Sequence, residues 1–169
     1  MWWSRHIAIA LVVAALAGCG FRPIHGERGG VEIAAHLARV EVSDILGDLG
    51  PELADLLEQD LAPRGAAERT QYRLGVTLYE GITALVTERD TLVRRYDFQL
   101  DARYVLTEGI SGTVLEQGDV RTVTSYNIIE SADFATLVAE QSAGRRAARE
   151  IGRKIVERLT LYFDRERAR

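Results

Sequence analysis

A strict alternation of apolar and polar residues over residues 96–106 constrains the fold of this 169-residue chain more than any other feature. The even positions are apolar: Tyr96, Phe98, Leu100, Ala102, Tyr104 and Leu106. The odd positions up to 103 are polar: Asp97, Gln99, Asp101 and Arg103. A period of two is typical of a β-strand that buries one face. The odd-numbered face is therefore expected to meet water or a polar partner.

Further strands are predicted on both sides of this segment. Residues 72–78 alternate in the same way, and that strand is expected to continue to about Val86. The polar stretch ERDTLVRR, residues 88–95, is then the tip of a long hairpin. Another strand is predicted over residues 113–126, with a bulge or turn near Gly118, where the alternation breaks.

Two segments have the helical spacing of apolar residues. Residues 51–61 begin with Pro51, which suits a first helical turn, and carry a stripe of leucines. A second helix is predicted to start at its N-cap Ser131 and to bury one apolar stripe. That stripe consists of Phe134, Leu137, Val138, Ala148, Ile151, Ile155, Leu159 and Tyr162. The arginines of this helix lie mostly off the stripe, and we expect them to form a solvated face with neighbouring glutamates.

The order of these elements predicts the fold class. With a first strand expected over residues 37–42, the order is β-α-β-β-β-α. We expect an α+β domain, in which a single mixed or antiparallel sheet of about four strands carries two α-helices on one face, as a two-layer sandwich.

The first residues have the layout of a secretory signal. Arg5 precedes an unbroken run of ten apolar residues, 7–16, which is about half the roughly 20 residues that a membrane-spanning helix needs. Ala17 and Gly18 follow, and then the only cysteine of the chain, Cys19. This arrangement resembles the bacterial lipoprotein box, in which the cysteine is lipidated and the chain is cut before it. An ordinary signal peptide with a stray cysteine is the alternative, although a stray thiol is a liability in an oxidising compartment.

These observations divide the chain into three expected parts. Residues 1–18 are a lipoprotein signal peptide, residues 19–30 a lipidated tether rich in Gly and Pro, and residues 31–169 the folded domain. The residue after the cysteine is Gly20 rather than Asp, which by resemblance to the enterobacterial sorting rule favours the outer membrane.

Composition and motifs argue against several classes of function. A net charge of −4 argues against a nucleic-acid partner. One cysteine and the lack of a Cys/His cluster predict no disulfide framework, metal or cofactor. Motifs of hydrolases, metalloproteases and phosphate-binding loops are missing from the sequence. Asp97 and Asp101 share a strand face, but their backbones are expected to lie about 13 Å apart, beyond the roughly 5–9.5 Å of a glycosidase pair. We therefore predict a binding protein rather than an enzyme.

Five stretches of sequence, in this order, carry a resemblance to a known family. They are LAGCGFRPIHG around Cys19, YRLGVTL, YDFQLDARYVL, RTVTSYNIIESADFATLVAEQSA and RRAAREIGRKIVERLTLYF. Together they resemble the LptE family of lipopolysaccharide-assembly lipoproteins, in the form seen in alphaproteobacteria. The resemblance implies a sheet with two helices on one face, seated as a plug inside the LptD β-barrel of the outer membrane. It also implies a role in assembling that barrel and in passing lipopolysaccharide to the cell surface.

The family is also thought to bind lipopolysaccharide through basic residues at one end of the fold. Here the predicted hairpin tip offers Arg89, Arg94 and Arg95, whose planar guanidinium groups suit bidentate contacts with phosphate. A merely solvated tip is the alternative. The lysine that the enterobacterial form carries near the start of the last helix has no counterpart in residues 134–139. Two other functions stay open: an auxiliary lipoprotein of another envelope transporter, and an envelope hydrolase.

Overall fold

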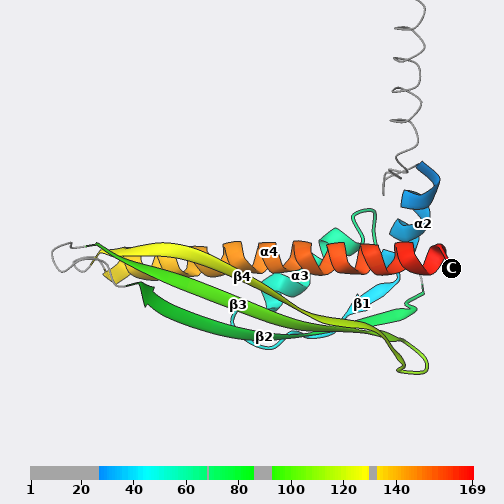
Figure 1. The fold of residues 1–169 in the computed structure, drawn as a ribbon, viewed down its shortest axis with the longest axis horizontal. Helices are drawn as coiled ribbons and strands as arrows, with labels where there is room; N and C mark the ends of the chain where they lie inside the picture. The colour runs from blue at the N-terminus through cyan, green and yellow to red at the C-terminus, as the bar shows by residue number, and fades with distance from the viewer. Residues whose placement is uncertain (1–26, 68, 86–92, 130–132) are drawn as a thin grey trace, which may run out of the picture.

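The computed structural model describes residues 27–67, 69–85, 93–129 and 133–169 (Figure 1). Its helices and strands, in chain order, are α2 (Glu27–Leu37), β1 (Val40–Val42), α3 (Gly50–Leu61), β2 (Tyr72–Leu85), β3 (Val93–Glu108), β4 (Val114–Ile129) and α4 (Asp133–Arg167). A four-stranded sheet thus lies against helices, which confirms the predicted α+β class. None of the helices in these ranges is long and apolar enough to cross a membrane.

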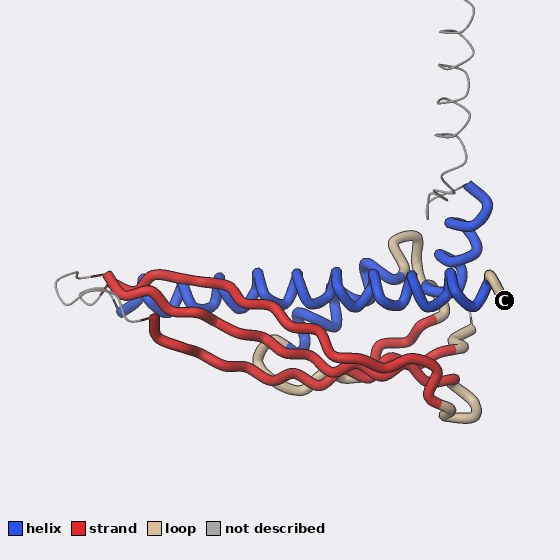
Figure 2. The backbone as a smooth tube through the Cα atoms, in the orientation of Figure 1, coloured by secondary structure: helices blue, strands red, loops and turns tan. Residues whose placement is uncertain are grey.

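The sheet is mixed and elongated. Its strand order is β1-β2-β3-β4, with the short β1 parallel to β2 and the other pairs antiparallel. The hairpin of β2 and β3 pairs without interruption from Tyr72↔Glu108 to Leu85↔Arg95. Figure 2 shows these long strands running beside α4 over most of its length. The 35 residues of α4 correspond to a helix about 50 Å long, since each residue adds about 1.5 Å.

The core lies between the sheet and the helices on one of its faces (Figure 1). The even positions of β3 from Phe98 to Leu106 are buried, as the alternation predicts. Fully buried side chains of α3 and α4 complete the core: Leu53, Leu57, Ile151, Ile155 and Leu159. The helix predicted over residues 51–61 is confirmed, with Pro51 and Glu52 in its first turn.

The structure contains a third helix that the sequence analysis did not predict. Helix α2 begins at Glu27, inside the range 19–30 that we expected to be a tether, and ends at Leu37, which we had placed in the first strand. Its buried Ile33 and Leu37 join the core. His36 stacks on Phe163 of α4, with ring centroids 5.2 Å apart, and its Nδ1 lies 3.0 Å from the Tyr72 hydroxyl. This tertiary packing outweighs the low helix propensity of Gly29 and Gly30.

The irregularity in β4 lies elsewhere than predicted. The register changes from Leu106↔Glu116 to Thr107↔Val114, so Leu115 is the inserted residue of the bulge. At Gly118, where we expected the bulge, the pairing with Tyr104 is regular. A Cβ atom at Gly118 would lie 2.9 Å from the Tyr104 hydroxyl oxygen. The glycine that breaks the alternation therefore accommodates the buried Tyr104 ring.

Candidate functional site

The hairpin end of the molecule holds the part of the predicted arginine site that the structure describes. Arg89 lies outside the described residues. Arg94 belongs to β3, opposite Ile128 of β4. Arg95 is exposed, and its guanidinium Nη2 donates a hydrogen bond to Ser125 Oγ at 3.1 Å. The structure therefore places one of the three candidate side chains, Arg95, on the outer face of the sheet.

The outer face continues as a ladder of polar side chains across β3 and β4. Ser125 Oγ donates to Asp97 Oδ1 at 2.6 Å, which links Arg95 to Asp97 through one hydroxyl. Further along, Asp101 accepts hydrogen bonds from Arg121 and from Gln99. The Arg121 bond, followed by the Gln99 bond, holds the pKa of Asp101 below its usual value. Asp97 and Asp101 thus have separate partners and do not form a carboxylate pair.

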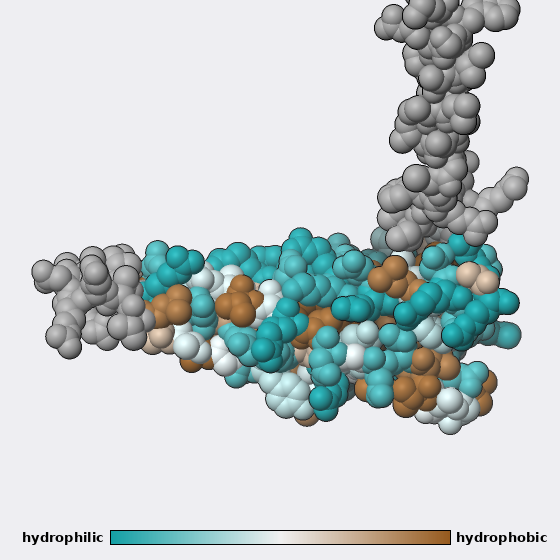
Figure 3. Space-filling view, in the orientation of Figure 1, coloured by the Kyte–Doolittle hydropathy of each residue, from teal (hydrophilic) through white to brown (hydrophobic). Residues whose placement is uncertain are grey.

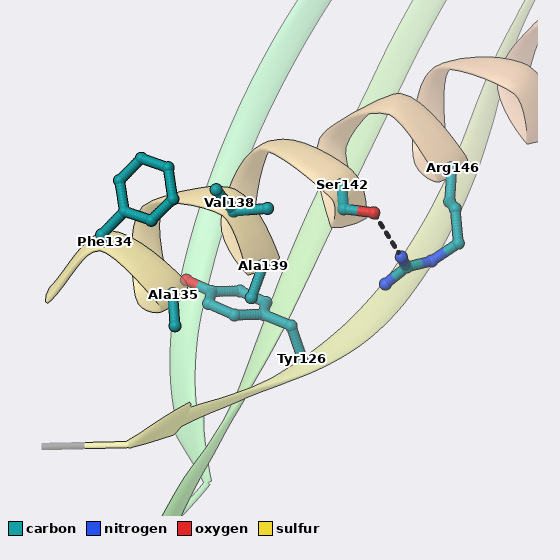
Figure 4. Close-up of a pocket in the computed structure, with 7 residues that line it drawn as sticks. All are labelled: Tyr126, Phe134, Ala135, Val138, Ala139, Ser142 and Arg146. Atoms are coloured by element: carbon teal, nitrogen blue, oxygen red, sulfur yellow. Dashed lines mark hydrogen bonds between the residues drawn. The ribbon is translucent and has the colours of Figure 1, made fainter. Parts of the chain in front are cut away.

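A shallow apolar groove lies at the same end, between β4 and the first turns of α4 (Figure 4). Tyr126 reaches from β4 under Ala135 and Ala139, while the Phe134 ring points away from the sheet. The groove encloses about 430 Å³, within the range of small-ligand sites. Burial, with some help from the negative charge of Glu140, raises the pKa of the Tyr126 hydroxyl, so that this group stays neutral.

Among the described residues, Arg146 is the one cation that lines this groove. Arg146 of α4 donates through Nη1 to Ser142 Oγ at 3.1 Å and through Nη2 to the Ser125 carbonyl oxygen at 3.4 Å. Arg146 and Arg95 are thus both bonded to Ser125, one through its carbonyl and the other through its hydroxyl. Neither Arg146 nor Tyr126 was predicted as a site residue. No local spacing pattern indicates the contact of Arg146 with Ser125, because the two residues lie 21 positions apart.

The first turns of α4 are exposed, which corrects the predicted apolar stripe. Ala148, Ile151, Ile155 and Leu159 are fully buried, as expected. Phe134, Leu137 and Val138 instead expose 80%, 53% and 43% of their surfaces. Further along α4, by contrast, Leu49 approaches the helix at Gly144 and Leu53 of α3 approaches it at Gly152. Figure 3 shows apolar side chains on the surface at this end of the molecule.

Several other cations of α4 pair with acidic groups at its surface, in agreement with the predicted solvated face. Arg153 and Lys154 both contact Glu150, and Arg149 lies 3.8 Å from Glu52 of α3. Within the described ranges, no three His, Cys, Asp or Glu side chains are grouped so that they could hold a metal ion. The chemistry that the described hairpin end offers is therefore binding: an apolar groove beside guanidinium groups.

Solved structures share this fold. A predicted lipoprotein from Caulobacter crescentus CB15 superposes with a TM-score of 0.64 at 19% identity, covering 79% of this chain and 96% of that one. A minor lipoprotein from Acinetobacter baumannii gives a TM-score of 0.56 at 12% identity, covering 72% and 91%. Comparison with curated proteins gives no match. This chain thus shares its α+β fold with these two lipoproteins.

The sequence model of the lipopolysaccharide-assembly family LptE matches residues 37–159, which is most of the chain. This chain therefore belongs to the LptE family and has a role in lipopolysaccharide assembly. The family is a non-enzymatic component of lipopolysaccharide transport. The matched residues include the whole sheet, α3 and α4 as far as Leu159.

Proposed function

We propose that this chain is the lipoprotein plug and assembly partner of an LptD-type outer-membrane β-barrel and that it binds lipopolysaccharide directly at its hairpin end. The observation that carries the binding proposal is the exposed apolar groove lined at one end by Arg146. Arg146 and Arg95 are both hydrogen-bonded to Ser125. Lipopolysaccharide combines apolar acyl chains with anionic phosphates, and the groove and guanidinium groups match these two parts.

The proposal also includes a lipid anchor at Cys19 and no enzymatic activity. Three acyl chains at the amino terminus would hold the chain to the outer membrane, because each buried methylene contributes about 0.8 kcal/mol. Mass spectrometry of the mature protein should then find an acylated Cys19 as its first residue. An unmodified amino terminus at another residue would contradict the anchor.

The binding proposal is tested by removing the three candidate arginines together. A charge-assisted hydrogen bond contributes about 1.5–3 kcal/mol where water is partly excluded and nearer 1 kcal/mol at an exposed tip. The triple variant Arg89→Ala, Arg94→Ala, Arg95→Ala should therefore bind lipopolysaccharide roughly ten- to a hundredfold more weakly than the unchanged protein.

The matched control removes the same charge from the surface of α4, with Arg145→Ala, Arg149→Ala and Arg153→Ala. It should bind within about twofold of the unchanged protein, because ion pairs on an exposed surface contribute little. Equal losses of lipopolysaccharide affinity in the two triple variants would show that binding depends only on the net charge of the protein. Unchanged binding by the hairpin variant would show that these arginines are exposed to solvent and do not contact lipopolysaccharide.

The polar outer face supports the plug, because a water-filled barrel lumen is a polar environment for the ladder that includes Asp97 and Asp101. An auxiliary lipoprotein of another envelope transporter is the alternative function. Copurification decides between them: the plug should be recovered with a large outer-membrane barrel, and the auxiliary protein with a different transporter.

A further inference from the structure

The two edges of the sheet differ in how their outward-pointing backbone groups are bonded. Along β4, side chains of α4 bond to outward-pointing carbonyl groups: Lys154 Nζ donates to Arg121 O at 2.7 Å, and Arg146 to Ser125 O at 3.4 Å. At the other edge, β1 pairs with β2 only from Tyr72 to Leu74. Proteins normally protect long strand edges with charges, prolines or covering elements, because an open edge accepts another strand.

The direction of the β2 backbone groups follows from one hydrogen bond. Leu74 O accepts from Ser43 N at 2.9 Å, so the N–H and C=O groups of Leu74 point away from β3. These groups alternate along a strand, and the β2–β3 register is continuous. The backbone groups of Glu80, Ile82 and Ala84 therefore also point outward, away from the hairpin.

Among the described residues, the edge of the outer stretch of β2, residues 79–84, pairs with no strand, although the loop before α3 comes close to its first part: a Cβ at Gly47 would lie 4.0 Å from Glu80 Oε1. All six residues are exposed, and no backbone hydrogen bond from a described loop or turn reaches them. The stretch contains no proline and no basic residue, and Glu80 is its only charge. Tyr79 and Ile82 expose 56% and 50% of their surfaces. A free edge of this composition is suited to pairing with a partner strand.

The acidic side chains next to the open edge favour a partner strand that carries a basic side chain. The loop that carries Asp48 lies beside Glu80, since a Cβ at the neighbouring Gly47 would lie 4.0 Å from Glu80 Oε1. Burial and the negative charges of Asp48 and Glu140 raise the pKa of Glu80, in keeping with an acidic group at the start of the open edge. A second copy of this chain would bring a second acidic set to the same junction. A strand with a basic side chain opposite Glu80 would instead be attracted, as cross-strand pairs of opposite charge are.

We propose that residues 79–84 of β2 add an extended strand of the barrel protein to the sheet, with a basic side chain opposite Glu80 and an apolar one beside Ile82. The inference rests on the proposed function for the identity of the partner. Main-chain hydrogen bonds from Glu80, Ile82 and Ala84 give the contact its affinity, and the side chains on either side of them give it specificity. Lipopolysaccharide binding is not required for it.

The experiment is amide hydrogen exchange at single-residue resolution on the full chain, alone and in the purified complex with its LptD-type barrel. In the free chain, the amides of Glu80, Ile82 and Ala84 should exchange faster than those of Tyr79, Gly81 and Thr83, which face β3. In the complex, the three outward amides should slow by about tenfold or more. This alternation distinguishes strand addition from simple covering, which would slow neighbouring amides without a period of two.

A stable complex in which the outward amides keep their free rates overturns the inference and leaves the proposed function standing. Failure to isolate any complex with a barrel overturns both. Protection that appears in the free chain and grows with protein concentration assigns the edge to a second copy and also overturns the inference.

A pair of proline variants provides the matched control. Ile82→Pro removes an outward N–H at the open edge, and Val123→Pro removes one at the β4 edge that α4 covers. Ile82→Pro should lower the yield of complex about tenfold and Val123→Pro should not, with circular dichroism confirming that both variants fold. Equal yields would contradict the inference. Glu80→Arg is the second variant, and it should also lower the yield, because it places two basic groups opposite each other.

Discussion

The two ends of the sheet differ in how completely helices cover them. At the end near β1, α2, α3 and α4 enclose the core, and His36, Tyr72 and Phe163 form an aromatic cluster. At the hairpin end, α4 is the only described helix beside the sheet (Figure 1), and its Phe134 is 80% exposed. One helix therefore serves as core in its second half and as an accessible surface in its first turns. The comparison shows that an apolar stripe identifies the face of a helix but not whether a partner is already present.

The largest expected effect is a difference between the two ends of α4 in how much stability is lost when an apolar side chain is truncated to alanine. Ile151→Ala removes a fully buried side chain of α4, and we expect it to lower the free energy of unfolding by about 2–5 kcal/mol. Leu137→Ala on the same helix, where Leu137 is 53% exposed, should change it by no more than about 0.5 kcal/mol. Urea unfolding measures both. Similar losses would show that the hairpin end is packed in the free protein.

A second effect compares two glycines of the sheet. A Cβ at Gly118 meets the Tyr104 ring, so Gly118→Ala should lower the free energy of unfolding by about 1–3 kcal/mol through overpacking. Gly75 has open space at the same position, and Gly75→Ala should be neutral or slightly stabilising. Thermal unfolding followed by circular dichroism ranks the two variants. A neutral Gly118→Ala would mean that the Tyr104 ring moves aside freely.

The smallest expected effect is a pH dependence of the polar ladder. The pKa of Asp101 is lowered in the folded state from its ordinary value of 3.8. Its contribution to stability is therefore present above pH 3.8 and is lost as the pH falls through the folded pKa. Asp101→Asn should be less stable than the unchanged protein at pH 6, and the difference should shrink as the pH falls below about 4. A constant difference would contradict the role of the Arg121 bond.

Sequence reasoning succeeded where a local pattern determines the structure. The period of two in residues 96–106 predicted which side chains of β3 are buried, because alternate residues of a strand point to opposite faces. It failed where contacts between residues far apart in the sequence determine the structure. Helix α2 depends on packing against Phe163, and Arg146 depends on the Ser125 carbonyl. Neither contact leaves a trace in the spacing of neighbouring residues.

The candidate site was predicted only in part for the same reason. The pairing of β2 with β3 confirms a long hairpin, but Arg94 and Arg95, which were predicted to lie in its tip, belong to β3. The groove lined by Tyr126 and Val138 was not foreseen, because it forms between two separate elements, β4 and α4. The spacing that predicted a buried stripe was right about the face of the helix and wrong about its first turns.

The central claim is that the uncovered hairpin end contacts lipopolysaccharide, and crosslinking in living cells tests it most directly. A photoreactive amino acid is placed at Val138, beside the groove, or at Leu161 near the other end of α4. The two positions are similarly exposed, at 43% and 37%. The account predicts a lipopolysaccharide adduct at Val138 and none at Leu161. No adduct at Val138, or equal adducts at both positions, would contradict it.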